Sequence, residues 1–122
     1  MRSRLAKVHR LGRFGYNTDN YEETLAWYQE NFNFTPTDVL NAPGNPDHDV
    51  AVFMRVDNGK TYVDHHCLLL ARVQKDTQVH HSSFEVEDID TQFMGYRWLE
   101  EKGHELVWGI GQHVHGSQVF GY

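Results

Sequence analysis

The stretch HHCLLLARVQKDTQVHHSSFEV, residues 65–86, contains two His-His pairs, and each pair opens a run that is typical of a β-strand. The second histidine of the first pair, His66, lies 15 residues before its counterpart, His81. Side chains alternate between the two faces of a strand, so His66 shares a face with Leu68, and His81 shares a face with Ser83. The pattern predicts that one histidine of each pair points into a common cup.

The partners of these two histidines, His65 and His80, are then expected to be orienting residues or rim residues. Nine histidines in a chain of 122 residues is a high number. Any isolated histidine is best interpreted as a surface or core residue. Histidines grouped at the starts of strands favour a functional role, because imidazole changes its charge near neutral pH.

A strand followed by a helix cap and a helix occurs on both sides of the quoted stretch. Asp19 and Glu22 form a capping-box pattern before the first helix, and Asp88 or Asp90 caps the second. Gly103 suits the position just past the second helix. The predicted strands cover 13–18, 35–42, 50–57, 62–73, 79–86, 104–111 and 116–122, and the predicted helices cover 21–32 and 89–103.

The two halves of the chain form a weak internal repeat. A shift of 68 residues places Asn20 on Asp88, and it also places Arg13 on His81. The sequence therefore predicts an α+β fold of two paired βαβββ-type modules. These modules form a half-open, mostly antiparallel barrel with helices outside and the final strand or strands missing. Residues 1–8 are expected to be a leader or linker before a domain at 9–122, with modules at 9–73 and 79–122, the second incomplete at its C-terminus.

Composition excludes several classes of protein. The net charge of −6 and the short basic cluster at the start argue against a nucleic-acid binder. No apolar run is long enough to span a bilayer, and the start lacks the apolar core of a secretory signal. Cys67 is the only cysteine, so an intrachain disulfide is excluded and a cytoplasmic location is expected.

Three segments together resemble a known family. They are DHHCLLLA (64–71), VHHSSFEVED (79–88) and GQHVHGSQVFGY (111–122). Their order and spacing are similar to those of the C-terminal module pair of extradiol ring-cleavage dioxygenases. These enzymes belong to the vicinal oxygen chelate superfamily, which also contains the glyoxalases.

The resemblance implies a non-haem Fe(II), or sometimes Mn(II), held by two histidines and a carboxylate, and cleavage of a catecholic aromatic with O2. By position, His81 matches a metal ligand, and His66 matches the histidine on the O2 side. His113 matches the histidine that hydrogen-bonds substrate, and Tyr122 matches the tyrosine that contacts a substrate hydroxyl. Ser83 and Glu85 are expected to line the cup or to support the ligands.

Two positions depart from the family pattern. The family's first ligand is a histidine in a strand that reads L-G-H, whereas this chain has Leu11-Gly12-Arg13. Guanidinium offers no lone pair to a metal, so Arg13 is expected to bind an anionic substrate group instead. The chain stops at Tyr122, before the strand that carries the family's carboxylate ligand.

Two functions follow from this comparison. One is an extradiol dioxygenase-like domain acting on a catechol. The alternative is a metal-free vicinal oxygen chelate module that binds a small aromatic or anionic ligand through Arg13. An isomerase or lyase of the glyoxalase type is less favoured, because His66 and the His113–Tyr122 spacing match the dioxygenases. An unpaired sheet edge invites pairing with another chain, so a homodimer is expected.

Overall fold

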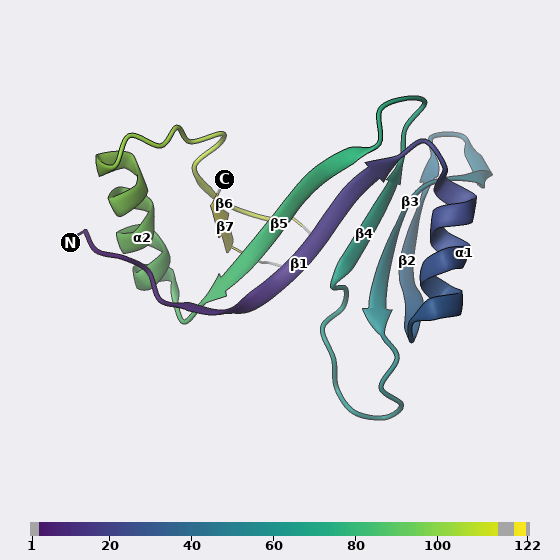
Figure 1. Ribbon diagram of the computed structural model, residues 1–122, viewed down its shortest axis with the longest axis horizontal. Coiled ribbons are helices and arrows are strands. Elements are labelled where there is room, and N and C mark those ends of the chain that lie inside the picture. The colour runs from purple at the N-terminus through teal and green to yellow at the C-terminus, as the bar shows by residue number, and fades with distance from the viewer. Residues whose placement is uncertain (1–2, 115–118, 122) are drawn as a thin grey trace. The chain divides into compact units, whose positions relative to one another are not determined.

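The computed structural model describes residues 3–114 and 119–121 (Figure 1). The chain divides into two compact units, one formed by Gly12–Ser83 and the other by the segments before and after it. The elements in order are β1 (Val8–Thr18), α1 (Tyr21–Asn31), β2 (Phe34–Ala42), β3 (Asn45–Val56), β4 (Leu68–Arg72), β5 (Gln78–Val86), α2 (Ile89–Glu101), β6 (Ile110–Gln112) and β7 (Val119–Gly121).

One sheet has the strand order β2-β3-β4-β1-β5, and β6 and β7 form a separate antiparallel pair. Strand β3 is antiparallel to both β2 and β4, whereas β1 is parallel to β4. The larger sheet is open, with β2 and β5 at its ends. The predicted fold class, α+β with a mostly antiparallel sheet that does not close, is therefore confirmed.

The core of the Gly12–Ser83 unit lies between this sheet and helix α1 (Figure 1). Val52 and Met54 of β3 and Leu68 and Leu70 of β4 are buried there with Tyr21. The alternate positions of these strands face the other side of the sheet. The helix therefore leaves one sheet face uncovered within this unit, and the candidate site lies on that face.

Strand β4 is shorter than the sequence predicts. Pairing between β3 and β4 starts at Met54 with Leu68, so Asn58-Gly59 opens a loop rather than a tight hairpin. His65 and His66 therefore precede the strand. The strand-parity argument for His66 is wrong, although the argument for His81, which lies within β5, stands on an observed strand.

Other boundaries also differ from those expected. Helix α1 is capped at Asn20 rather than Asp19, and the Asn20 side chain accepts no hydrogen bond from a backbone amide of the helix, although its Nδ2 donates to the Glu23 carboxylate at 2.7 Å. Strand β3 begins at Asn45, because Gly44 adopts a φ of 74° and turns the chain at once. The predicted strand 104–111 contains only the start of β6, since Gly109 has a φ of 83° just before that strand.

The second unit contains α2 and the β6–β7 pair. Asp88 caps α2 as expected, accepting a hydrogen bond from the Thr91 amide at 2.7 Å. Phe93 and Leu99 have the spacing of a buried helix face, yet they are 43% and 45% exposed. Gly95 is the buried residue, because Ala6 packs where its side chain would lie. No described helix is long and apolar enough to cross a membrane.

Candidate functional site

Arg13 lies on the sheet face that α1 leaves uncovered. Its neighbour Phe14 packs against the core, as does Tyr16, so alternation places Arg13 and Gly15 on the opposite face. Phe53 of β3 is on that face too, because its neighbours Val52 and Met54 are core residues. Arg13 is partly buried, so its charge is not fully screened by solvent.

His81 lies against Gly15 across the β1–β5 neighbour pair. A Cβ on Gly15 would be 3.2 Å from Cε1 of His81 and 3.3 Å from Cβ of Leu69. The missing side chain at Gly15 therefore provides the space that the imidazole ring occupies. The ring is also tied to its neighbour, since Nδ1 of His80 and Nδ1 of His81 are 2.7 Å apart.

His66 approaches the same face from the loop before β4. Its ring meets Phe53 edge-on, with 4.8 Å between ring centroids. The pKa of His66 is lowered to about 4, chiefly by burial and also by the nearby Arg13, His65 and His81. His66 is therefore neutral at neutral pH. The electrostatic influence of Arg13 and His81 on His66 shows that the structure brings these three predicted residues together.

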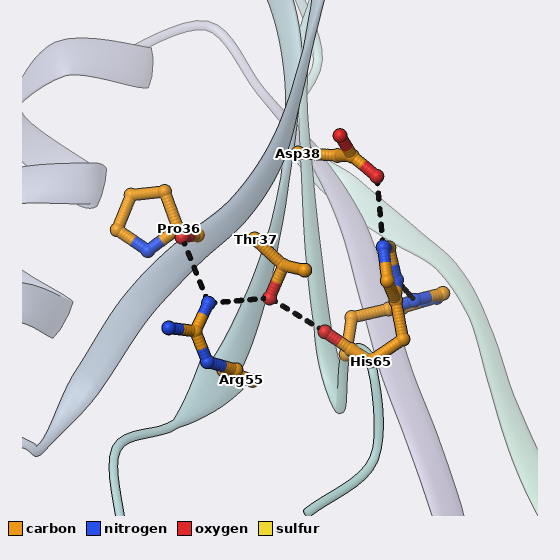
Figure 2. A network of polar contacts seen from close by, with 6 residues as sticks. Pro36, Thr37, Asp38, Arg55 and His65 are labelled. Carbon is orange, nitrogen blue, oxygen red and sulfur yellow. Dashed lines mark hydrogen bonds and ion pairs between the residues drawn. The ribbon is translucent and has the colours of Figure 1, made fainter. Parts of the chain in front are cut away.

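His65 is held by residues of β2 that sequence reasoning did not select (Figure 2). Nε2 of His65 lies 2.8 Å from a carboxylate oxygen of Asp38, and the Thr37 hydroxyl donates to the His65 carbonyl at 2.6 Å. Neighbouring residues of a regular strand point to opposite faces. Here a register shift between Pro36 and Asp38 makes Thr37 an extra residue, and both Thr37 and Asp38 contact His65.

Pro36 is a sequence signal for the bulge. Pro36 has no backbone N–H to donate to a ladder, so it suits an edge strand or the start of a strand. A proline within a strand is equally typical of a bulge. A bulge at this point changes the face of the strand to which the side chain at position 38 points.

The remaining predicted site residues lie elsewhere or outside the described part. His113 belongs to the second unit, where its ring centroid is 4.6 Å from that of Phe120. Tyr122 lies outside the described residues. Glu85 is paired with Arg10 at 2.6 Å. The roles of His113 and Tyr122 stay predictions.

The described residues do not by themselves form a metal site of the expected kind. They contain no group of three or more His, Cys, Asp or Glu side chains placed to hold a metal ion. Arg13 occupies the position of one expected ligand and has no lone pair to offer. His81 is therefore the one expected ligand that the described sheet face carries.

Comparison with known proteins shows the family of the chain. The sequence model of the Glyoxalase/Bleomycin resistance protein/Dioxygenase superfamily matches residues 10–121. The chain belongs to this superfamily. Within the superfamily, it is 35% identical over 75 residues to metapyrocatechase 2 of Cupriavidus necator, a match that covers 61% of this chain and 22% of that protein.

Two solved structures share the fold. The 2,3-dioxygenase LapB of Pseudomonas sp. KL28 has a TM-score of 0.75 at 14% identity, over 94% of this chain and 38% of the other. The Mn(II)-bound glyoxalase of Novosphingobium aromaticivorans has a TM-score of 0.71 at 19% identity, over 94% of this chain and 34% of the other. The chain thus spans well under half of the length of each of these relatives.

Proposed function

We propose that this chain is an extradiol ring-cleavage dioxygenase-like domain, and that its uncovered sheet face binds a catecholic aromatic. The observation that carries the proposal is the grouping of Arg13, His66 and His81 on that face. The likeness to a metapyrocatechase supports the substrate class. The family resemblance of the two His-His segments supports the reaction class.

The three side chains suit a catechol for separate reasons. A neutral His66 has a ring nitrogen that can accept a proton from a catechol hydroxyl. Arg13 carries a permanent charge that stabilises the resulting anion, or an anionic substituent on the ring. Phe53 supplies an apolar wall beside His66. Catechol is therefore expected to bind as its anion.

The family resemblance implies a metal at this site. Fe(II), or alternatively Mn(II), would be held by His81 and by donors that the described residues do not supply. A facial site needs two further ligands. We therefore propose no reaction step through the metal and confine the mechanism to the protein side chains.

Arg13 also favours a second candidate function. An arginine in place of a histidine ligand gives the site a fixed positive charge. The same face then binds a small aromatic or anionic ligand without a metal. In this candidate Arg13 is the anchor and ring cleavage does not occur.

One set of measurements separates the two candidates. The protein is purified anaerobically with Fe(II), its iron content is measured, and catechol and O2 are added while the ring-cleavage product is followed by absorbance. Stoichiometric iron and product formation support the dioxygenase. Iron-free protein that binds benzoate, with binding lost in Arg13→Ala and kept in the exposed control Arg97→Ala, supports the metal-free module. Failure to bind either aromatic contradicts both.

We also propose that the chain forms a homodimer and is located in the cytoplasm. Strand β5 is at one end of the sheet order, and Val79 on it is 62% exposed. An edge with exposed apolar side chains favours pairing with a second copy. The free thiol of Cys67 fits a reducing compartment.

A further inference from the structure

Three titratable side chains are connected in series at the candidate site. A carboxylate oxygen of Asp38 is 2.8 Å from Nε2 of His65 (Figure 2). Nδ1 of His65 is 3.0 Å from Nδ1 of His66. Both nitrogens of the His65 ring are thus engaged. This series of contacts ends at the His66 ring, whose other nitrogen, Nε2, remains for a ligand.

This connection determines which nitrogen of each ring carries hydrogen. An ionised carboxylate only accepts hydrogen bonds, so Nε2 of His65 is protonated and donates to Asp38. In a neutral His65 ring Nδ1 then has the lone pair, and it accepts from Nδ1–H of His66. A neutral His66 that is protonated on Nδ1 has its lone pair on Nε2. The order of contacts therefore selects one tautomer of His66.

We propose that Asp38 and His65 are positioning residues that hold His66 as the Nδ1–H tautomer and receive a proton from it when Nε2 is protonated by the ligand. The tautomer follows from the contacts alone. The identity of the ligand as a catechol rests on the proposed function.

The proton transfer balances without any further reactant. The O–H bond of the catechol breaks and an N–H bond forms at Nε2 of His66. The N–H bond at Nδ1 of His66 breaks, and an N–H bond forms at Nδ1 of His65. The result is a neutral His66, a catecholate, and an imidazolium at His65 whose charge is compensated by Asp38.

The surroundings of the two rings favour transfer of the proton from His66 to His65. His66 is partly buried and lies near the charge of Arg13, so its pKa is about 4 and it holds a proton poorly. The His65 side chain is 51% exposed and has a carboxylate partner. The second pair shows the contrast, because within the described residues His80 is in contact with His81 but with no carboxylate.

The backbone of His65 is fixed independently of its ring. The Thr37 hydroxyl donates to the His65 carbonyl, and Nη1 of Arg55 donates to that hydroxyl and to the Pro36 carbonyl, both at 3.1 Å. Changes at Asp38 therefore leave the main chain anchored. The ring of His65 can be perturbed without moving the loop.

Nitrogen-15 NMR of the histidine rings in the ligand-free protein at neutral pH measures the tautomer directly. His66 resonances are assigned by their loss in His66→Gln. We expect the Nδ1–H form in the wild type and in Asp38→Glu. In Asp38→Asn the new amide can either donate to or accept from His65, so it no longer selects one tautomer. We expect the ratio of the Nδ1–H to the Nε2–H form of His66 to fall by roughly two- to fivefold, because exposed ion pairs are of modest strength. The control Asp47→Asn, an exposed carboxylate of β3, leaves the ratio unchanged.

The same variants with catechol test the proton transfer. We expect the catecholate absorbance of the bound ligand to fall by roughly two- to fivefold in Asp38→Asn and to recover in Asp38→Glu. An Nε2–H tautomer in the wild type, or equal ratios in Asp38→Asn and the wild type, overturns the positioning role. Equal catecholate in all variants overturns the transfer. If catechol binds to no variant, the proposed function fails, and the transfer fails with it, while the NMR result still decides the positioning role.

Discussion

At the scale of single residues, the site depends on what surrounds each histidine rather than on the histidines themselves. The sequence contains four histidines in two pairs, and strand alternation assigns His66 to the cup and His65 to the rim, but both residues precede the strand on which that argument depends. The structure distinguishes them through Phe53 on one side and Asp38 on the other. Sequence spacing located this region, but not Asp38, because that contact depends on a bulge in a different strand.

The first prediction concerns the titration of His66. The proton resonance of its ring, followed by NMR, is expected to titrate with a midpoint near pH 4, below the ordinary 6.5. His66 binds its second ring proton more tightly in the unfolded chain than in the folded protein. The free energy of unfolding therefore falls as the pH drops from about 6.5 to about 4. Above about 6.5 the effect is absent.

Replacing Arg13 provides the control for this titration. Arg13→Gln removes a positive charge near the ring, so the midpoint rises toward the ordinary value. A His66 midpoint at or above 6.5 in the wild type shows that the ring is neither buried nor close to Arg13.

The second prediction concerns Gly15. Gly15→Ala places a methyl group against the His81 ring and Leu69, at distances where the neighbours must move. We expect a loss of about 1–3 kcal/mol in the free energy of unfolding, measured in urea. In a His81→Ala background the loss should shrink, because one of the two crowded neighbours is gone. Equal losses in both backgrounds exclude contact between Gly15 and His81.

At the scale of elements, local signals predicted the helices well and the strand limits poorly. Helix α2 begins at the cap that Asp88 provides and is followed by Gly103, whose φ is 85°. These signals act over a few residues and are visible in sequence. The start of β4 is not a local property of the sequence, because it depends on pairing with β3. That pairing ends where Met54 lies opposite Leu68.

The third prediction compares the two helix caps that the internal repeat places in equivalent positions. Asp88 accepts a hydrogen bond from the Thr91 amide, whereas Asn20 makes no such bond. Asp88→Ala is therefore expected to lower the thermal unfolding midpoint clearly more than Asn20→Ala. Circular dichroism of the two variants measures this. A larger effect at Asn20 contradicts the assigned caps.

At the scale of the whole molecule, the fold class could be predicted because it depends on the order of strands and helices. Core membership could not be predicted equally well. Phe93 and Leu99 have helical spacing, yet Ala6 covers Gly95 instead, and that contact joins residues far apart in sequence. Periodicity identifies an apolar stripe without identifying what packs on it.

The fourth prediction concerns the homodimer. Analytical ultracentrifugation is expected to show a dimer for the wild type and a shift to monomer for Val79→Lys, because a charge on an edge strand opposes pairing. Lys75→Glu, a charge change in the connection before β5, serves as the control and keeps the dimer. A monomeric wild type, or a dimer unaffected by Val79→Lys, contradicts pairing through β5.

The packing of Ala6 on Gly95 has a consequence for how the protein is made. The second unit is built from both ends of the chain, whereas Gly12–Ser83 is continuous. During translation the continuous segment is complete as soon as Ser83 has left the ribosome. Ala6 and its neighbours are synthesised before α2, and they can pack against Gly95 only after α2 has left the ribosome.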